Sequence, residues 1–382
     1  MIKAEKECVL IKPEDIKPSS KDFEVIGAIN PGAIRISDGR IVLYVRIIEK
    51  LKKASDKKYF YSPRMVGKDE FKIKIDKFSK KIVTDNSELD FSFKDGTKRL
   101  TFISHFRRVI LAENGFKIIS IDEKPSFFGV EWDGELGIED PRITKIGNLY
   151  FMTYVSLSRN ENVSTSYSIS NDCINWYRRG IIFGEQDKDV VLFPEMINDK
   201  YIAFDRPEGS FQFTLPHIWV SYSANLEFWG KPKPIELYKP GDWDEGKNGS
   251  GPPPIKTAKG WLLLYHAITE KSKIKKEIFI IKFIKKFMRI KEIEKIPIYA
   301  IGAALFDLND PEKLISKSKE PIFIPSKKYE KDIFGERGII FPTGLVPDSQ
   351  MKNILVYSGA GDSLTTVKKV SLKKILSSLR KV

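Results

Sequence analysis

The stretch Gly147-Asn148-Leu149-Tyr150-Phe151-Met152-Thr153-Tyr154-Val155 decides the fold, because it joins a tight-turn pair to a run of strand-forming residues. The same unit, a short polar turn followed by apolar residues, recurs along the chain, with apolar runs at 41–45, 100–103, 201–204, 261–265 and 354–357. The first five units lie about 50–60 residues apart, the range expected for propeller blades of four short strands. The pattern therefore predicts an all-β propeller.

These units alone do not fix the number of blades. The last gap is longer than the others, and strands from both ends of a chain often close a propeller ring, so six units do not dictate six blades. A second repeat supports the same architecture, because Ser170 to Trp176 and Ser223 to Trp229 share the pattern Ser-x-Asp/Asn-x-x-x-Trp. An Asx side chain that bonds its own turn is a hairpin device similar to the Asp-boxes of sialidase propellers, and we expect it to be structural.

The composition is that of a folded globular protein. The chain has 382 residues, a formal net charge of +14 and 41% hydrophobic residues, and we expect one catalytic domain over residues 1–382. The basic charge leaves a nucleic-acid scaffold as an alternative. The lysines are dispersed among Glu and Ile without an arginine-rich arm, so we expect no nucleic-acid partner. Cys8 and Cys173 show no metal-ligand spacing, so we expect no metal site and no disulfide framework.

Three segments depart from the rhythm of the blades. Residues 1–20 form a polar leader without the apolar core of a signal peptide, and no stretch reaches the length of a membrane-spanning helix, so we expect a cytoplasmic protein without membrane contact. Residues 270–297 are rich in Lys and Ile, which predicts an extended blade hairpin or, alternatively, a hairpin buried against a second copy in a homo-oligomer. Residues 366–382 carry an apolar stripe among lysines, which predicts a terminal helix packed on the propeller.

The chemistry centres on Gly137-Ile138-Glu139-Asp140-Pro141-Arg142, directly before the strand quoted above. Two carboxylates and a guanidinium lie within four residues. Pro141 biases Asp140 toward extended backbone and makes a helical Asp140 improbable. A carboxyl held rigidly beside an arginine is suited to act as a general acid. The alternative is an ordinary ion pair in a loop.

Short polar clusters also end the other predicted blades. They contain Asn30, Arg46, His105, Arg159, Lys188, Asp205, Arg206, Glu208, Asp244, Tyr265, His266 and Asp362. A propeller gathers such loops and strand ends around a central funnel, so residues distant in sequence can share one site. Carboxylates, cations and aromatic rings together suit acid and base work on sugars. The sequence lacks a nucleophile elbow, a phosphate loop and a dinucleotide fingerprint, and a lone His such as His105 is more often structural.

Eight motifs run in order over nearly the whole chain. They are Asn30-Pro-Gly-Ala-Ile-Arg35, Gly137-Ile-Glu-Asp-Pro-Arg142, Lys188-Asp-Val-Val-Leu-Phe-Pro-Glu195, Arg206-Pro207, Gly249-Ser-Gly-Pro-Pro-Pro-Ile-Lys256, Gly260-Trp-Leu-Leu-Leu-Tyr-His266, Gly302-Ala-Ala-Leu-Phe-Asp307 and Gly359-Ala-Gly-Asp362. Together they resemble glycoside hydrolase family 130. The resemblance implies a five-bladed β-propeller, here with a short C-terminal helix, and an inverting enzyme that cleaves β-mannosides. Many members of that family are phosphorylases, and some hydrolyse β-1,2-mannosides.

The resemblance also implies roles for individual residues. Asp140 is the general acid that delivers a proton to the leaving oxygen, in some members through a sugar hydroxyl, and Arg142 orients Glu139 or Asp140. The mannosyl ring is held by Asn30, Arg46 and Asp362, and the blade-end clusters add Glu139, Arg142, His105, Asp244 and His266 as substrate contacts. Inorganic phosphate is held by Lys188, Arg206, Arg159 and Tyr265. We expect phosphate as a co-substrate and no cofactor.

One departure from the family pattern bears on the acceptor. Asp205 stands directly before Arg206-Pro207, where phosphorylases of the family usually have a His. A carboxylate facing phosphate is unfavourable and suits a water-activating base, a task that Glu208 or Glu195 can share. Lys188 and Arg206, however, are cations that hydrolases of the family tend to lack. We favour phosphorolysis to α-mannose 1-phosphate, with a hydrolytic β-mannosidase and a non-catalytic carbohydrate-binding propeller as alternatives.

Overall fold

The protein is all-β, as the repeated turn and strand units predict. A computed structural model describes residues 1–209, 213–270, 297–332 and 337–382. Within these residues five antiparallel sheets contain four or more strands each, and two small sheets form an arm. The expected hairpin or subunit contact at 270–297 lies almost wholly outside the described residues.

The five sheets follow one another along the chain, and β1 and β27 from the two chain ends add to the fifth and the fourth sheet. The first contains β2 (Phe23–Arg35), β3 (Ile41–Leu51), β9 (Phe102–Leu111) and β10 (Ile118–Ile121), and the second β11 (Gly137–Ile146), β12 (Leu149–Ser158), β13 (Asn162–Ser170) and β14 (Tyr177–Phe183). The third contains β15 (Asp187–Leu192), β16 (Tyr201–Pro207), β17 (Trp219–Ser223) and β18 (Trp229–Pro234). The fourth contains β19 (Asn248–Ser250), β20 (Ile255–Thr257), β21 (Gly260–Glu270), β22 (Pro297–Phe306), β23 (Leu314–Ser318) and β27 (Leu379–Lys381).

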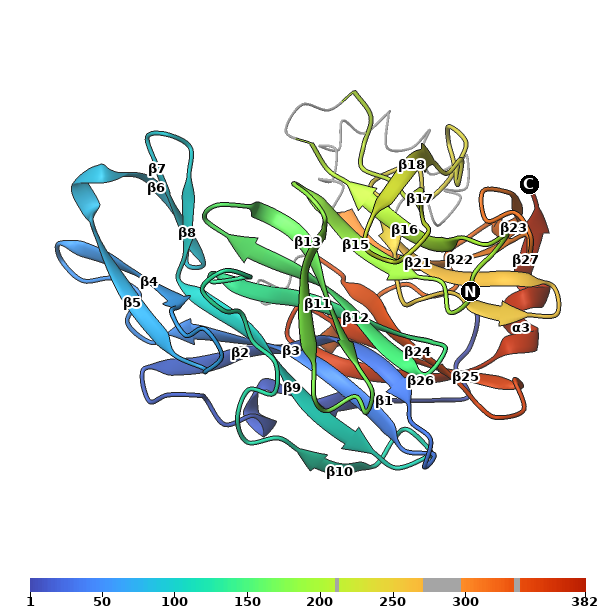
Figure 1. Ribbon diagram of the computed structural model, residues 1–382, viewed down its shortest axis with the longest axis horizontal. Helices are drawn as coiled ribbons and strands as arrows, with labels where there is room; N and C mark the ends of the chain where they lie inside the picture. Colours follow the sequence, from blue (N-terminus) through green and yellow to red (C-terminus); the bar gives the residue numbers. More distant parts are fainter. Residues whose placement is uncertain (210–212, 271–296, 333–336) are drawn as a thin grey trace, which may run out of the picture.

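The fifth sheet joins both ends of the chain. It contains β24 (Ile340–Pro347), β25 (Asn353–Ala360) and β26 (Leu364–Ser371), and β1 (Lys6–Ile11) from the N-terminal segment pairs with β26. The predicted polar leader 1–20 therefore contributes a strand to this sheet. Within that strand, Ile11 is fully buried and lies opposite Thr365. Figure 1 shows the two chain ends on the same side of the molecule.

Successive sheets pack face to face, each pair through an apolar cluster of its own. One cluster joins the first and second sheets around Tyr44, Ile143 and Tyr154, and another joins the third and fourth around Phe204 and Trp261. Further clusters join the second to the third, the fourth to the fifth and the fifth back to the first. Inner strands also touch in the same order, with β2 against β11 and β24, β15 against β11 and β19, and β24 against β21 and β22. Each of the five large sheets thus contacts the sheets before and after it, and the fifth contacts the first.

An arm leaves the first sheet between β3 and β9. It contains β4 (Tyr59–Met65) paired with β5 (Ile73–Ser79), and β6 (Val83–Asn86), β7 (Asp90–Phe93) and β8 (Lys98–Leu100) in a second small sheet. The arm projects at the left of Figure 1. Short 3-10 turns lie at η1 (Pro13–Asp15), η2 (Lys80–Ile82) and η3 (Lys328–Glu330).

The repeated Ser-x-Asp/Asn pattern forms the expected turn in both copies. Ser170 Oγ accepts the backbone N–H of Cys173, and Asp172 Oδ1 accepts those of Ile174 and Asn175. Ser223 and Asn225 accept the equivalent N–H groups of the next sheet. These side chains close hairpin turns, so the structural role is confirmed.

The terminal helix is shorter than predicted. Residues 366–371 belong to β26, because Val367 pairs with Tyr357 and Cys8 inside the fifth sheet. The helix is α3 (Leu372–Ser378), with Ser371 as its N-cap, and it buries Leu372 and Ile375 against the fourth and fifth sheets. The apolar stripe thus belongs to a strand followed by two helical turns. Among the described residues, no helix is both long and apolar enough to cross a membrane.

Candidate active site

The site is formed where three strands, β2, β11 and β15, each contain a β-bulge. Strand pairing shifts between Ile29 and Gly32 in β2, between Glu139 and Arg142 in β11, and between Lys188 and Val191 in β15. At each shift one residue has a positive φ, namely Asn30 (47°), Asp140 (51°) and Asp189 (55°). Asn and Asp tolerate this left-handed backbone better than other non-glycine residues. A bulge redirects the side chain it carries, so three polar groups turn toward the centre.

Asp140 differs from its predicted backbone for this reason. It lies in a strand and not in a helix, as Pro141 favours, but the bulge holds φ in the left-handed region instead of the extended one. The Nδ2 of Asn30 donates to Oδ1 of Asp140 at 2.8 Å, and Nη1 of Arg46 donates to the same oxygen at 3.1 Å. Arg46 also binds Glu139 through its other terminal nitrogen. Asn30, Arg46, Glu139 and Asp140 therefore lie together, as the resemblance implies.

The charges around Asp140 set its protonation state. Burial alone raises the pKa of Asp140, but the positive charges of Arg46 and Arg142 and the hydrogen bond from Asn30 outweigh burial and lower it. Asp140 is accordingly a carboxylate in the protein alone. Its side chain keeps 15% of its surface exposed, so a bound molecule can reach it.

Asp189 is the centre of the other half of the site. Its Oδ2 lies 2.6 Å from Nη1 of Arg206 and 3.3 Å from Nε2 of His266, and its Oδ1 lies 3.5 Å from Nη2 of Arg142. Burial favours a raised pKa, but the charge of Arg206, the hydrogen bond from His266 and the charge of Arg142 hold the pKa of Asp189 well below its usual range. Burial lowers the pKa of His266, so this histidine is neutral between the two charged partners.

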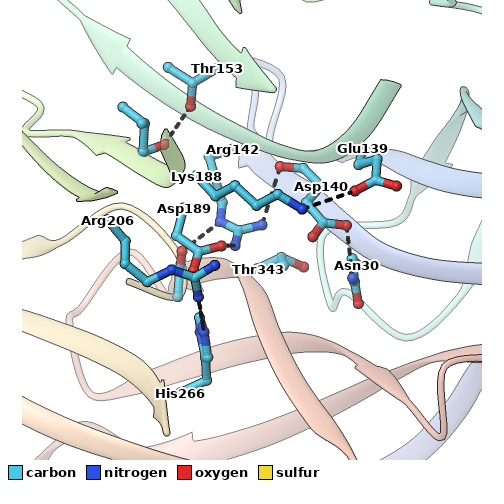
Figure 2. A network of polar contacts seen from close by, with 12 residues as sticks. Asn30, Glu139, Asp140, Arg142, Thr153, Lys188, Asp189, Arg206, His266 and Thr343 are labelled. Atoms are coloured by element: carbon cyan, nitrogen blue, oxygen red, sulfur yellow. Dashed lines mark hydrogen bonds and ion pairs between the residues drawn. The ribbon is translucent and has the colours of Figure 1, made fainter. Parts of the chain in front are cut away.

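Arg142 connects the two halves. Its Nε donates to the backbone oxygen of Gly251 at 2.7 Å, and its Nη1 donates to the backbone oxygen of Asp140 at 3.3 Å. The predicted orienting role therefore applies to the main chain of Asp140, whereas Glu139 is held by Arg46 and Lys188. Figure 2 shows Arg142 between Asp140 on one side and Asp189 on the other, with the Lys188 side chain extended across them.

Lys188 and Arg206 form one rung of the ladder between β15 and β16. They are opposite each other in the register, so both side chains project from the same face of the strand pair. Lys188 is 31% exposed, and its ammonium lies 3.8 Å from Oε2 of Glu139. We call Lys188, Arg206 and Arg142 the cation cluster.

Glu208 borders the cation cluster on the side of Arg206. Its carboxylate lies 3.1 Å from Nη2 of Arg206 and 2.5 Å from the ammonium of Lys247. Burial acts to raise the pKa of Glu208, but the hydrogen bond from Lys247 and the charge of Arg206 lower it. Glu208 is thus a partner of two cations, which does not suit the predicted role of a water-activating base.

Asp205 faces away from the cation cluster, which corrects its predicted role. Neighbouring residues of a strand project to opposite faces, and Arg206 already occupies the face toward Asp189. Asp205 is only 2% exposed and accepts a hydrogen bond from Ser221 Oγ at 2.9 Å. A buried carboxyl behind the strand pair neither opposes phosphate nor activates water at Asp140. The alternative base Glu195 forms an exposed ion pair with Lys256.

Tyr265 and His266 show the same alternation on β21. His266 joins Asp189, whereas the hydroxyl of Tyr265 donates to Oδ2 of Asp244 at 2.6 Å in the core between sheets. Asp244 is fully buried and also lies 2.8 Å from the ammonium of Lys317. The structure does not bring Tyr265 or Asp244 to the site, so the predicted phosphate contact of Tyr265 and substrate contact of Asp244 are not supported.

Three further predicted residues lie apart from the cation cluster or at its edge. His105 is buried, and its Nε2 lies 3.0 Å from Glu49, so it belongs to a structural network in the first sheet instead of a substrate site. The Nε of Arg159 lies 3.0 Å from Glu135, with which it forms an ion pair. Asp362 has a φ of 51° and lies within the electrostatic reach of Arg46 and Asp140, so it remains at the Asp140 half.

Sequence patterns assign no role to four residues that line this site, namely Asp189, Lys247, Tyr299 and Phe341. Asp189 follows Lys188 at the end of a predicted blade. Its residue type alone does not indicate that it contacts two arginines and a histidine. Lys247 is one lysine among many. The ring of Phe341 lies 4.2 Å from that of His266 and beneath the guanidinium of Arg142, and Tyr299 lies beside both rings. Aromatic residues inside strands usually indicate core, so neither ring stood out.

Comparisons with known proteins agree with one another. A family model described as beta-1,4-mannooligosaccharide phosphorylase matches residues 111–381. The beta-1,2-mannobiose phosphorylase of Listeria innocua serovar 6a is 30% identical over 380 residues, which cover 97% of this chain and 96% of that protein. The 1,2-beta-oligomannan phosphorylase of Thermoanaerobacter sp. strain X514 is 33% identical over 270 residues, which cover 69% of this chain and 78% of that protein.

A solved structure is also similar over almost the whole length. It is that of beta-1,2-mannobiose phosphorylase from Listeria innocua in complex with beta-1,2-mannobiose. It superposes with a TM-score of 0.80 at 29% sequence identity and covers 97% of this chain and 96% of that chain.

Proposed function

The chain belongs to glycoside hydrolase family 130, and on that premise we propose that it cleaves β-1,2-linked manno-oligosaccharides by phosphorolysis. It is an enzyme that acts on β-mannosides. Phosphate attacks the anomeric carbon from the face opposite the leaving oxygen, so a β-mannoside gives α-mannose 1-phosphate. The β-1,2 linkage is proposed because the two relatives named above act on 1,2-linked substrates.

The cation cluster is the observation that carries this proposal. Lys188, Arg206 and Arg142 project toward one another beside Asp140, while Asp205 lies behind the strands. An anionic acceptor needs fixed cations that hold it and aim it at the anomeric carbon. Asp189 orients the two guanidiniums, of which Arg206 is 5% exposed and Arg142 1%, and Lys188, at 31%, is the most accessible of the three cations.

Asp140 is the proposed general acid. As a carboxylate with a lowered pKa it cannot donate a proton in the protein alone. A phosphate bound at the cation cluster adds negative charge close to Arg142, which weakens the electrostatic effect that keeps Asp140 ionised. We therefore expect phosphate binding to raise the pKa of Asp140 and make protonation of the leaving oxygen possible. The proton passes to the sugar either directly or through a sugar hydroxyl.

Asn30, Arg46 and Asp362 are proposed to hold the mannosyl ring. Asn30 and Arg46 already bind the same oxygen of Asp140, so their positions are fixed before a sugar arrives. Such preorganisation lowers the cost of orienting the substrate. Burial raises the pKa of Asp362 to about 6, so near neutral pH its side chain is a carboxylate that can accept hydrogen bonds from sugar hydroxyls.

The fold that supports this site is proposed to be a five-bladed propeller. Each of the five large sheets is one blade, and the circular order of contacts between inner strands and between apolar clusters supports a ring. Pairing of β1 with β26 closes it with strands from both chain ends.

Release of sugar from β-1,2-mannobiose with and without inorganic phosphate tests the proposal. We expect mannose and mannose 1-phosphate only when phosphate is present. Free mannose formed at the same rate without phosphate would instead identify a hydrolase, and binding without any product would identify a carbohydrate-binding propeller. β-1,4-Mannobiose is the matched control for the linkage, and we expect it to react more slowly.

A further inference from the structure

Behind the cation cluster, on the other face of β15 and β16, two carboxyl groups meet. Lys188 and Arg206 oppose each other on the face toward the site, so their neighbours Asp187 and Asp205 both project from the opposite face. Asp187 lies opposite Pro207 in the register and therefore diagonal to Asp205, and the two carboxyl groups lie within hydrogen-bonding reach of each other. We call these two residues the acid pair. The proposed catalysis uses neither of them.

The acid pair is tied directly to the backbone that carries the cations. Oδ1 of Asp187 accepts the backbone N–H of Arg206 at 3.0 Å, which joins the two strands next to the rung of Lys188 and Arg206. The backbone oxygen of Asp187 accepts the hydroxyl of Thr165 from β13 at 2.8 Å. Asp205 is held by Ser221 from β17. Residues of β13, β16 and β17 therefore hold the acid pair in place. Asp187 in turn holds the backbone of Arg206, the residue that lies opposite Lys188.

Two carboxylates in contact in a buried place cannot both be ionised cheaply. Burial and the charge of Asp205 raise the pKa of Asp187 to about 8, and burial raises the pKa of Asp205 to about 6. The opposing effects on Asp187 come from Arg206, whose backbone N–H donates to it and whose charge acts on it, and Ser221 opposes the rise at Asp205. Near neutral pH the acid pair therefore holds one proton in common.

We propose that the acid pair of Asp187 and Asp205, through the hydrogen bond from the backbone N–H of Arg206 to Asp187, positions Lys188 and Arg206 for the anionic acceptor. The proposal rests on the proposed phosphorolysis at the front of the same strands. The shared proton lets one carboxyl donate to the other, which holds β15 against β16 at the rung. Loss of that proton leaves two like charges in contact, which separates the carboxyls and displaces the backbone N–H of Arg206.

The test separates phosphate from sugar binding. In Asp205→Ala the partner of Asp187 is lost, and we expect the KM for phosphate to rise roughly tenfold while the KM for β-1,2-mannobiose stays within about twofold. Asp205→Asn keeps an acceptor for Ser221 and gives Asp187 a permanent amide donor, so we expect the KM for phosphate to return to about the wild-type value. An effect on overall folding alone does not raise one KM and spare the other.

The pH dependence of the phosphate KM gives a second test. It uses the wild type and Asp205→Asn, so it can be measured even if Asp205→Ala folds poorly. As pH rises through about 6 to 8 the wild type loses the shared proton, whereas Asp205→Asn has none to lose. The ratio of the phosphate KM of the wild type to that of Asp205→Asn is therefore expected to rise with pH, and taking this ratio cancels the titration of phosphate itself. Asp133→Asn, a buried carboxylate bound by Tyr154, Ser156 and Ser166 in the second sheet, is the control for lost stability.

An unchanged phosphate KM in Asp205→Ala, or a KM ratio that does not vary with pH, would overturn this inference. The same holds if Asp133→Asn raises the phosphate KM as much as Asp205→Ala does. Wild-type protein that forms product without phosphate would instead overturn the proposed function, so the two failures are distinguishable.

Discussion

Asp140 and Asp189 occupy equivalent bulges in neighbouring inner strands, yet they belong to very different surroundings. Both are aspartates with positive φ, and each lies where the strand pairing shifts register. Asp140 keeps 15% of its side chain exposed beside one amide and one guanidinium, whereas Asp189 keeps 4% and is enclosed by Arg206, Arg142 and His266. The two residues thus have the same backbone conformation but different neighbouring side chains. Because of these neighbours, the carboxyl of Asp140 is accessible to a bound molecule, whereas that of Asp189 is a buried anchor for the two arginines.

The largest effect on activity is expected when Asp140, the more exposed of the two aspartates, is replaced. Asp140→Asn keeps the shape and the hydrogen bond from Arg46 but removes the group that protonates the leaving oxygen. We expect kcat to fall about 10³-fold, because a positioned general acid contributes roughly 10²–10⁴. Initial rates of mannose 1-phosphate formation measure this. Retention of more than a tenth of the wild-type kcat would exclude Asp140 as the acid.

Substitution of Asp189, the buried carboxylate of the two, should lower both stability and activity. Asp189→Asn leaves Arg206 and Arg142 without their carboxylate in a site that excludes water. Breaking a buried ion pair in this way costs about 3–5 kcal/mol, so we expect the free energy of unfolding in urea to fall by that order, together with a raised KM for phosphate.

Asp140→Asn is the matched control for this stability change. It exchanges the same atoms at an equivalent bulge, and we expect a loss of about 1 kcal/mol or less because Asp140 remains partly hydrated. Equal losses in the two variants would remove the distinction between acid and anchor.

The acid pair adds a pH dependence of stability that Asp140 and Asp189 do not share. The pKa values of Asp187 and Asp205 are raised to about 8 and about 6, so the folded state holds a proton that the unfolded chain, with carboxyls near 3.8, has released. Stability from this pair is present at low pH and is lost as pH rises from about 4 toward 8. We expect the Tm of the wild type to fall by about 2–4 °C relative to Asp205→Asn between pH 5 and pH 8.5, measured by calorimetry. A constant difference in Tm would show that the pair holds no proton in this range.

The smallest effect on catalysis is expected at Tyr265. Tyr265→Phe removes a hydroxyl that contacts Asp244 in the core and nothing at the cation cluster. We expect the KM for phosphate to be unchanged and the free energy of unfolding to fall by about 1 kcal/mol, the typical cost of one buried hydrogen bond. A tenfold rise in the phosphate KM would return Tyr265 to the acceptor site.

The comparison also shows what the sequence can predict. The turn and strand units predict the all-β class, and the resemblance to a known family places Asn30, Arg46 and Asp140 at one site. Two of the errors share one cause, because consecutive residues of a strand face opposite sides and the sequence alone does not say which residue faces the site. Asp205 beside Arg206 and Tyr265 beside His266 are both cases of this kind.

Other features depend on pairing partners and therefore could not be predicted from local patterns. Val367 belongs to a strand instead of the terminal helix because Cys8, from the opposite end of the chain, pairs with it. The anchor role of Asp189 depends on three partners from β11, β16 and β21. Such roles follow from the assembled sheets and not from the residue type.

The central claim is that phosphate, held by Lys188, Arg206 and Arg142, is the group that takes the mannosyl unit. Phosphorus and proton NMR of β-1,2-mannobiose incubated with the protein and inorganic phosphate tests it most directly. We predict one α-mannose 1-phosphate formed, and one inorganic phosphate consumed, for each mannose released. Release of mannose with no change in the phosphorus spectrum would contradict the account.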